Sequence, residues 1–375
     1  MAANTNSDIT IIGAGIIGLA LAAKLVSRGY STTIVDPEVP GSGCSFGNAG
    51  IISDWGIYPP AAMAGLRKLP KMLLDPYGPL VVRPTHLHRF IGWGLKAALA
   101  NSPKRLAHIV AAQAALTRIA MDCYRPLLQE CHASDLIDSK GALIVCRTHE
   151  ALDHRAKRIP AWRENGISVE KINSHEIHAL EPALAKDLVG GLFFPNAARC
   201  LDPFELSRRI VAATAAKGVM FYRDRVRDLK DVQGEWNVGL QSGASIVAKR
   251  VIVAAGFWSA ELLRPLGYKV NIEAERGYHL MLPNPSILLN RPVSIAEANF
   301  AATPMASGVR LAGTAEFAGP DAPADNRRAT MMYGLAKPFL PGVCDVGAIP
   351  WMGCRPSLPD MLPAIGRASR HQNLY

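Results

Sequence analysis

The sequence contains few cysteines, and no two of them form a CxxC pair. The chain has 375 residues and seven cysteines, an odd number spread along its length. Structural zinc sites and disulfide frameworks need closely spaced or evenly paired cysteines, so we expect reduced thiols instead. The cysteines are Cys44, Cys123, Cys131, Cys146, Cys200, Cys344 and Cys354.

The histidines likewise lack the spacing of a metal motif. His149, His154, His175 and His178 are neighbours in the sequence, but they match no metal-binding pattern. His175 and His178 have the i, i+3 spacing that a metal could use, yet no third ligand follows nearby. We therefore expect solvated helix faces here and no metal site.

The sequence also lacks a long apolar run. None approaches the roughly 18 residues that span a bilayer, and the N-terminal stretch MAANTNSD has neither the basic start nor the apolar core of a signal peptide. We expect a cytoplasmic protein. Its formal charge of +10 comes from dispersed Lys and Arg without a run of five like charges. This pattern argues against a nucleic-acid partner and leaves open a peripheral contact with the inner face of a membrane.

What the sequence does contain is a dinucleotide-binding pattern near its start. A short apolar strand pattern at 9–12 leads into Gly13, Gly15 and Gly18, and a helical pattern follows. Gly13 permits a tight turn, Gly15 leaves room for a pyrophosphate, and Gly18 allows close packing of helix on strand. A second apolar run ends in Asp36, at the distance expected of an acid that binds a ribose hydroxyl. An adenine dinucleotide is therefore the expected ligand, although these residues alone do not separate NAD from FAD.

A turn-rich segment follows at 37–53. Small residues dominate its stretch SFGNAG, and they let the backbone approach a flat or charged ligand. The glycine turn followed by SFGNAG resembles the D-amino-acid dehydrogenase branch of the FAD-dependent D-amino-acid oxidase and glycine oxidase superfamily. This resemblance implies that the cofactor is FAD and that the second loop contacts it through Ser45, Asn48, Ala49 and Gly50.

Two later stretches extend the resemblance to the cofactor site. Asp202-Pro203 begins a helical pattern, and the strand after it leads into Val226, which the resemblance makes an adenine contact. The run AKRVIVAAGFWS ends a strand in an AAG turn, the second fingerprint of flavoproteins of this kind. The resemblance therefore adds Ala255, Gly256 and Trp258 to the cofactor contacts. A single NAD-binding βαβ unit does not predict two such fingerprints.

The chain is longer than one core usually is, so two domains are expected. We predict the α/β class, α+β overall, with a Rossmann-like FAD-binding domain and a second domain built on an antiparallel sheet. Period-2 alternation after Val270 indicates that sheet. The FAD-binding domain is predicted to be discontinuous, comprising 1–56, 190–265 and 350–375. The substrate-binding domain comprises 57–189 and 266–349.

Two segments of the predicted substrate domain are expected to be helical. The stretch HLHRFIGWGLKAALA at 86–100 carries Phe90, Ile91, Trp93 and Leu95, which either pack in a core or form a membrane-facing patch. Residues 109–130 are expected to form a longer helix that ends near a kink at Pro126. Neither segment contains a catalytic constellation.

The substrate site is predicted from two stretches of the later chain. RGYHL matches a substrate-domain strand of the family, which makes Tyr278 and His279 candidates for the pocket wall. WMGCRPSLPDMLPAIG resembles the family pattern GxRPxxPDxLPxIG, in which the arginine holds the substrate carboxylate. Arg355 has the bidentate fork that suits a carboxylate, and a structural ion pair near the flavin is its alternative role.

The resemblance implies FAD-dependent oxidation of the Cα–N bond of a D-amino acid, or of a D-proline derivative. The product is an imine, which water hydrolyses to a keto acid and ammonia, and no separate catalytic base is assigned. The electron acceptor is expected to be a quinone or the respiratory chain. A glycine or sarcosine oxidase is the nearest alternative, and a non-catalytic NAD-binding protein is a remote one. Because family members usually continue for several tens of residues, we expect an incomplete chain.

Overall fold

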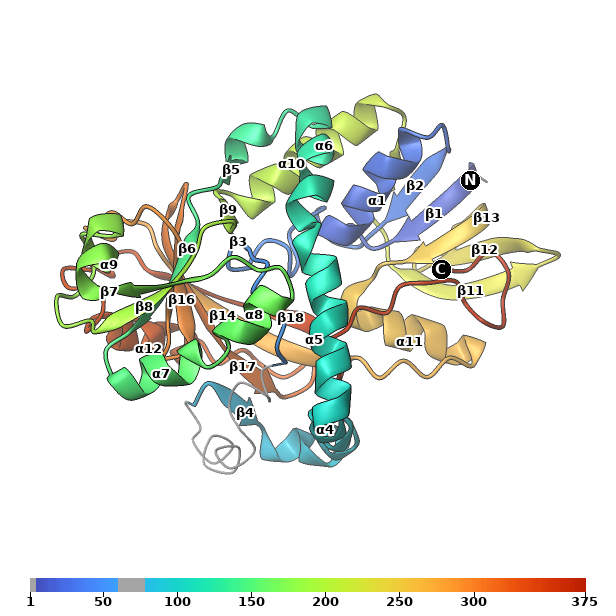
Figure 1. The fold of residues 1–375 in the computed structure, drawn as a ribbon. Helices are drawn as coiled ribbons and strands as arrows, with labels where there is room; N and C mark the ends of the chain where they lie inside the picture. The colour runs from blue at the N-terminus through green and yellow to red at the C-terminus, as the bar shows by residue number, and fades with distance from the viewer. Residues whose placement is uncertain (1–4, 60–77) are drawn as a thin grey trace.

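The computed structural model describes residues 5–59 and 78–375 (Figure 1). Within them the strands form a six-stranded sheet, a larger sheet that strand β4 joins, and a small three-stranded sheet. The six-stranded sheet lies near both termini in Figure 1, and the larger sheet lies on the other side of the molecule. This arrangement confirms the predicted mixed α/β class.

The six-stranded sheet has the order β10-β2-β1-β13-β12-β11. β1 pairs in parallel with β2 and β13, and β2 pairs in parallel with β10. The ends of β1 and β13 are in register at Ile12 and Val253, so the glycine turn and the AAG turn leave the sheet side by side. The strands are β1 (Thr5–Ile12), β2 (Thr32–Val35), β10 (Met220–Tyr222), β11 (Val226–Val232), β12 (Glu235–Leu240) and β13 (Ser245–Val253).

Apolar side chains cover both faces of this sheet. On one face, Ile11 and Ile34 pack with Leu19 of α1 (Ile16–Val26) and Ile210 of α10 (Pro203–Ala216). The predicted start of α10 is confirmed, because the Asp202 carboxylate caps it by accepting from two backbone N–H groups. The other face is covered by a second cluster around Trp236, which includes residues of α11 (Ser259–Leu263), η4 (Arg264–Leu266) and the C-terminal segment. The short helix η3 (Gly256–Trp258) precedes α11.

The larger sheet has the order β18-β14-β17-β16-β15-β6-β8-β7, with β4 paired to β17. Most neighbours are antiparallel, as the alternation after Val270 predicts, and helix α12 (Arg327–Ala336) packs on one face over an apolar core. The strands are β4 (Leu80–Val82), β6 (Ala142–Cys146), β7 (Glu170–Asn173), β8 (Gly190–Phe194), β14 (Glu273–Leu282), β15 (Val293–Ile295), β16 (Phe300–Met305), β17 (Gly308–Phe317) and β18 (Ile349–Ser357).

The remaining elements connect and flank these sheets. The small sheet has the order β3-β9-β5, with β3 (Ile51–Ile52), β5 (Ile137–Asp138) and β9 (Ala198–Cys200). The helices are η1 (Pro84–His86), α4 (Leu87–Ala100), α5 (Pro103–Arg118), α6 (Ala120–Glu130), η2 (Ser134–Leu136), α7 (His149–Ala156), α8 (Ile159–Glu164) and α9 (Ser174–Leu180). In the described part of the chain, no helix combines the length and apolarity needed to cross a bilayer.

One helix differs from the sequence prediction. The expected single helix over 109–130 is broken at Ile119, whose φ of −90° and ψ of 1° leave the helical region, and Pro126 lies inside α6. The predicted helix at 86–100 corresponds to α4, and its apolar side chains divide between a packed face and an exposed face; a membrane contact of the exposed face stays a prediction. Phe90 and Trp93 pack inward against Phe317, whereas Ile91 and Leu95 are exposed.

The predicted domain boundaries separate two strands from the sheet in which they pair. β8 and β18 hydrogen bond within the larger sheet, although the predicted FAD-binding domain includes 190–194 and 350–357. Strand pairing decides sheet membership, and it joins segments that are far apart in the sequence. The boundaries otherwise stay a prediction, and residues 60–77 of the predicted substrate domain lie outside the described residues.

Candidate active site

The glycine turn connects β1 to α1 in a conformation that only glycine fits well. Gly13 has a φ of +108°, and a Cβ at this position would overlap the carbonyl oxygen of Ala254. A Cβ at Gly18 would overlap the carbonyl oxygen of Gly13. The glycines therefore allow β1, α1 and the AAG turn to approach within backbone contact distance.

Asp36 lies directly against this turn. One of its carboxylate oxygens accepts from the Ala14 N–H at 2.7 Å, and the other accepts from the Glu38 N–H at 2.9 Å. The carboxylate is thus held at the carboxyl end of β2, beside the glycine turn at the end of β1. The structure brings the predicted ribose-binding acid and the predicted phosphate-binding glycines together.

The N-terminus of α1 offers an anion site. Gly15 is its N-cap and supplies no side-chain oxygen, and no acidic residue lies in the first turn. The Ile16 N–H instead donates to Ser45 Oγ at 2.9 Å, and a Cβ on Gly15 would lie 3.4 Å from that oxygen. The N–H groups of the first turn and the positive end of the helix dipole favour a phosphate here. Ser45 is placed to share in this site.

The predicted flavin loop is fixed by its own side chains. Asn48 donates from Nδ2 to the Ser45 carbonyl and accepts from the Gly50 N–H at Oδ1, both at 2.7 Å. Gly50 has a φ of +68°, and a Cβ there would lie 2.9 Å from the Cys200 carbonyl oxygen. Ala49 lies between Asn48 and Gly50. The loop from Ser45 to Gly50 is therefore a well-fixed element, as a cofactor-binding segment requires.

Arg310 on β17 holds this loop from the larger sheet. Its Nη1 donates to the carbonyl oxygens of Phe46 at 3.0 Å and Asn48 at 2.6 Å. Burial lowers the pKa of Arg310 to about 10, so the guanidinium remains charged at neutral pH. This residue was not predicted from the sequence. The sequence feature that could have indicated Arg310 is its position between the apolar Val309 and Leu311 on a strand with alternating residues.

His279 contacts the same loop and is neutral. Its Nδ1 lies 3.0 Å from the Gly47 carbonyl oxygen. A carbonyl can only accept, so Nδ1 carries the proton and Nε2 has the acceptor lone pair. Burial first, and then the charge of Arg310, lowers the pKa of His279 to about 4. The imidazole stacks on Trp351 with 4.9 Å between ring centroids.

Tyr278 lies on the opposite face of β14 from His279. Successive strand residues point to opposite faces. Tyr278 is 2% exposed, and its hydroxyl donates to Glu316 Oε2 at 2.6 Å, within the core beneath α12. Burial and this hydrogen bond raise its pKa. The structure thus does not bring the two predicted wall residues together, and a substrate contact of Tyr278 stays a prediction.

On the face of β14 and β18 that carries His279, two glycines lie between His279 and Arg355. We call Gly277 and Gly353 the glycine strip. Gly277 of β14 pairs in register with Gly353 of β18, so neither strand places its own side chain at the centre of this strip. At one end the Trp351 ring fills the space where a Cβ on Gly353 would lie. At the other end the Arg355 guanidinium fills the space where a Cβ on Gly277 would lie. The two glycines therefore allow a flat ring and a flat guanidinium to lie close to the strands.

Arg355 is also held in an ion pair at its end of the strip. Its Nη2 is 2.8 Å from Glu275 Oε1 and donates to the Thr314 carbonyl oxygen at 3.1 Å. The hydroxyl of Ser357 donates to the second Glu275 oxygen. An ion pair was the alternative role predicted for Arg355, and its position near the flavin stays a prediction. Half of the Arg355 side chain remains exposed, so a carboxylate in solvent can reach the guanidinium.

The second fingerprint lies beside the glycine turn. The Ala254 N–H donates to the Ile12 carbonyl oxygen at 2.8 Å, and Ala255 is the N-cap of η3. Gly256 has a φ of +59°, and a Cβ there would meet no atom within 4 Å. Trp258 is 49% exposed. Val226 packs against the apolar cluster that includes Ile12 at the end of β1. The predicted cofactor residues therefore gather around one end of the six-stranded sheet.

The cysteines and histidines form no second site in the residues described. All seven cysteines are free, and burial raises the pKa of Cys44 to about 12, which disfavours a reactive thiolate. No group of three His, Cys, Asp or Glu side chains with metal-binding geometry occurs in 5–59 and 78–375.

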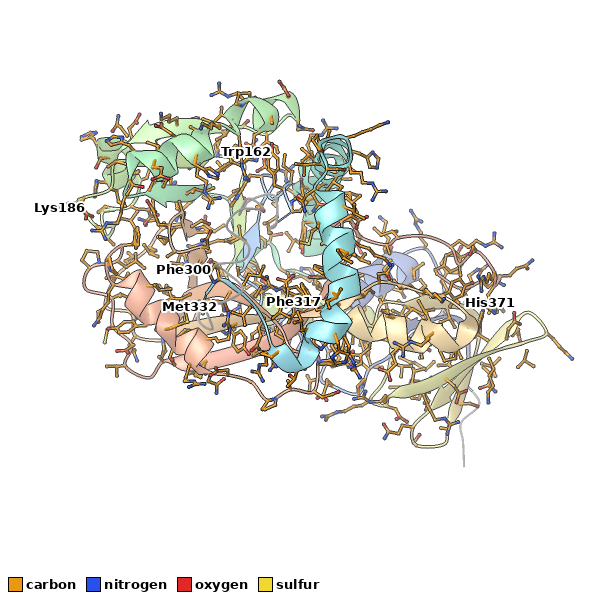
Figure 2. All side chains as sticks on the ribbon, turned by 90° about the horizontal axis from the view of Figure 1, so that it is seen from below. Trp162, Lys186, Phe300, Phe317, Met332 and His371 are labelled. Atoms are coloured by element: carbon orange, nitrogen blue, oxygen red, sulfur yellow. The ribbon has the colours of Figure 1, made fainter. Side chains whose placement is uncertain are left out.

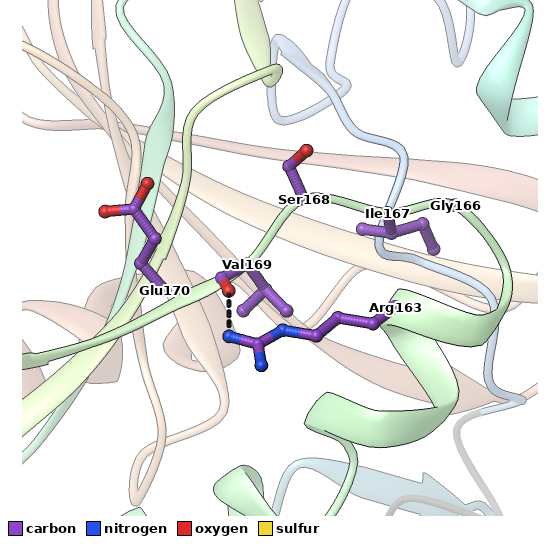
Figure 3. Close-up of a pocket in the computed structure, with 6 residues that line it drawn as sticks. All are labelled: Arg163, Gly166, Ile167, Ser168, Val169 and Glu170. Carbon is purple, nitrogen blue, oxygen red and sulfur yellow. Dashed lines mark hydrogen bonds between the residues drawn. The ribbon is translucent and has the colours of Figure 1, made fainter.

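A surface hollow of about 440 Å³ lies away from these residues, between α8 and β7. Figure 3 shows its lining, where Arg163 donates to the Val169 carbonyl oxygen at 3.1 Å. The hollow is shallow and contains no predicted site residue, so we assign no chemistry to it. It is lined by Arg163, Gly166, Ile167, Ser168, Val169 and Glu170.

The chain matches a known protein family over nearly its whole length. Residues 8–375 match the family described as FAD dependent oxidoreductase (DAO). A D-amino-acid oxidase of Bradyrhizobium diazoefficiens is 30% identical, with 96% of this chain and 88% of that protein aligned. A D-amino acid dehydrogenase of Methylobacterium nodulans is 31% identical, with 98% and 89% aligned.

Among solved structures, the glycine oxidase of Geobacillus kaustophilus superimposes with a TM-score of 0.72. The match covers 99% of this chain and 88% of that one, at 20% sequence identity. At this identity the similarity establishes the fold alone. The fold similarity agrees with the arrangement of two sheets around the glycine turn and the loop from Ser45 to Gly50.

Proposed function

This chain belongs to the FAD dependent oxidoreductase family, and we propose that it oxidises the Cα–N bond of a D-amino acid or a D-proline derivative. It is an FAD-dependent enzyme acting on amines or amino acids. The observation that carries the proposal is the position of Arg355, a half-exposed arginine at one end of a glycine strip whose other end is next to the predicted flavin loop. The names of the relatives at 30% and 31% identity support a D-amino acid as substrate.

The residues around the glycine turn fit the adenosine and pyrophosphate of FAD. Gly13 and Gly18 let β1, α1 and the AAG turn pack closely, and Gly15 leaves the N-terminus of α1 without a side chain. We assign the ribose to Asp36 and the adenine to Val226. Bound FAD supplies a two-electron oxidant for the Cα–H bond. The protein supplies binding and orientation.

Arg355 is proposed to bind the substrate carboxylate. A guanidinium presents five N–H donors, and Glu275 and the Thr314 carbonyl use only part of them. Glu275 would hold the side chain in place while the exposed edge of the fork takes the substrate. A carboxylate bound there is positioned at the strip formed by Gly277 and Gly353.

His279 is proposed to contribute at the other end of the strip. Because it is neutral and its Nδ1–H is committed to Gly47, its Nε2 is an acceptor. Such an acceptor suits the N–H of a substrate amine. The stack on Trp351 fixes the ring plane and excludes water from that side. Arg355 and His279 would then orient the two polar ends of an amino acid.

The visible spectrum tests the substrate class. Anaerobic addition of D-amino acids should bleach the flavin absorption, whereas L-amino acids should not. Glycine and sarcosine belong in the same panel, because a glycine or sarcosine oxidase is the nearest alternative that the sequence resemblance leaves open. Bleaching by glycine or sarcosine alone would replace our proposal with that candidate. Identification of the keto acid and ammonia would confirm deamination.

We propose a quinone or the respiratory chain as the electron acceptor. The D-amino acid dehydrogenase among the relatives supports this choice, and the D-amino-acid oxidase is the counterexample. Turnover with a soluble quinone should be much faster than turnover in air alone. Stoichiometric hydrogen peroxide formation that added quinone does not change would instead identify an oxidase.

A further inference from the structure

Helix α4 carries a continuous stripe of exposed aliphatic side chains. Leu87 is 50% exposed, Ile91 is 53% exposed, and Leu95 and Leu99 are each 62% exposed. A spacing of four residues places these side chains along one face of a helix. We call Leu87, Ile91, Leu95 and Leu99 the α4 face. Single exposed aliphatics are ordinary, but a contiguous row over three turns marks an interaction surface.

The opposite side of α4 is firmly anchored. Trp93 donates from Nε1 to the Ser357 carbonyl oxygen at 3.0 Å, and its ring centroid lies 5.2 Å from that of Phe317. Phe90 also packs on Phe317, with 4.7 Å between ring centroids. Figure 2 looks onto α4 from below, with Phe317 labelled beside it. The α4 face is therefore exposed on a helix whose inner side is already packed.

The segment of the sequence that contains α4 carries charges of one sign, although acidic side chains of other elements, Glu273 and Asp321, lie near the start of the helix. The sequence has no Asp or Glu from 78 to 121, a segment that contains six Lys and Arg residues. Four of these, Arg89, Lys96, Lys104 and Arg105, are exposed. An apolar stripe flanked by Lys and Arg is typical of helices that lie in the interface of an anionic bilayer.

We propose that the α4 face binds the surface of an anionic lipid bilayer. The aliphatic side chains would enter the interface, and the flanking basic groups would contact the phosphates of the headgroups. A second copy of this chain is a poorer occupant, because pairing two α4 faces would bring two sets of positive charges together. The absence of acidic residues over this segment likewise fits a negatively charged partner.

This contact would connect the membrane to the candidate active site. The strand residue that anchors Trp93, Ser357, donates its hydroxyl to Glu275, the partner of Arg355. A bilayer beneath α4 is thus close to the strands that hold the site, where it could present a lipid-soluble electron acceptor. This consequence rests on the proposed function, whereas bilayer binding by α4 does not.

Sedimentation with lipid vesicles tests the proposal without measuring turnover. The flavin-loaded protein should bind to vesicles of phosphatidylcholine with phosphatidylglycerol, and it should bind far less to phosphatidylcholine alone. Added salt should weaken binding. The triple variant Ile91→Gln, Leu95→Gln, Leu99→Gln should lose at least about tenfold in partition coefficient, because it removes three aliphatic side chains from the interface. Leu288→Gln, at another exposed aliphatic side chain (77%), should bind like the parent.

A second variant tests the charges. Lys104→Gln and Arg105→Gln together remove two exposed cations without touching the α4 face. This double variant should bind anionic vesicles roughly 30-fold less, which corresponds to about 1 kcal/mol for each cation near the surface. Its binding should also depend less on salt. Circular dichroism and flavin content establish that each variant is folded.

Three results would overturn the proposal: parent protein that does not sediment with anionic vesicles, equal binding of the triple variant, or equal binding to neutral and anionic vesicles. A concentration-dependent dimer that the triple variant abolishes would identify a second copy as the occupant instead. Since no result depends on turnover, failure here leaves the proposed oxidation of amino acids unaffected.

Discussion

Arg355 and Glu275 are register partners on β18 and β14, with 2.8 Å between Nη2 and Oε1. Glu275 is 8% exposed, so the loss of Arg355 would leave a largely buried carboxylate without a charged partner. The pair therefore gives Arg355 a structural role in addition to its proposed role in binding substrate. A test of either role has to separate them.

Arg355→Leu should reduce kcat/KM for the amino acid about 30- to 1,000-fold. The substitution removes a charge-assisted contact of about 2–4 kcal/mol with the substrate carboxylate, and each 1.4 kcal/mol is a factor of about ten. Arg355→Lys should recover only part of the loss, because an ammonium does not reproduce the fork. Steady-state kinetics measure the effect, with the exposed Arg125→Leu as control.

Adding Glu275→Gln to Arg355→Leu separates stability from binding. The double variant no longer has a buried, unpaired carboxylate, so its thermal unfolding temperature should return toward that of the parent. Its kcat/KM should stay low, because the substrate carboxylate still lacks a partner. Recovery of both quantities together would show that Arg355 acts only through the structure.

Gly15→Val should prevent FAD binding. A valine would place branched carbons at the N-terminus of α1, beside Ser45 Oγ, where we place the pyrophosphate. The visible absorbance of the purified protein reports flavin content. Gly334→Val on α12 is the control, because a Cβ at Gly334 has no neighbour within 4 Å and its φ is not positive. Full flavin content in Gly15→Val would refute the placement of the pyrophosphate at the N-terminus of α1.

Arg310→Met should weaken FAD binding, although Arg310 is not assigned as a contact of FAD. The variant releases the carbonyls of Phe46 and Asn48, so the loop that contains Ser45 is no longer held in one conformation. We expect the dissociation constant of FAD to rise at least about tenfold, the equivalent of about 1.4 kcal/mol. Titration of the apoprotein with FAD measures it, and Arg208→Met, on the exposed side of α10, should change nothing. Unchanged affinity would show that the loop does not depend on Arg310.

His279 should make the protein less stable as pH falls from about 6.5 to 4. The pKa is about 4 in the folded state and near its usual 6.5 in the unfolded chain, so the unfolded state binds more protons between these values. The free energy of unfolding should therefore decrease by roughly 3 kcal/mol across this window. Well above this window both states are neutral at this residue, and the effect is absent.

Urea denaturation at neutral pH and at a pH inside this window, for the parent and for His279→Gln, isolates the contribution of His279. Glutamine can still donate to the Gly47 carbonyl but does not titrate. The variant should lose less stability on acidification than the parent. Equal losses in the two proteins would mean that His279 is already protonated in the folded state within the window.

The sequence determined the local parts of this protein. The spacing of Gly13, Gly15, Gly18 and Asp36 predicts a strand, turn and helix, because glycine conformation and helix dipole act over a few residues. The helix cap at Asp202 is also local, because its carboxylate accepts from backbone N–H groups two and three residues away. The fold class and cofactor, which the family match confirms, could be predicted for this reason.

The tertiary structure decided how distant segments combine. Tyr278 and His279 are neighbours on one strand, and only the pairing of β14 with β17 and β18 determines that His279 faces the flavin loop while Tyr278 enters the core. Arg310 is 262 positions from Asn48 along the chain, and Glu275 meets Arg355 only because β14 pairs with β18. Contacts over such separations depend on strand register, which sequence periodicity does not specify, because the same alternation is compatible with many pairings.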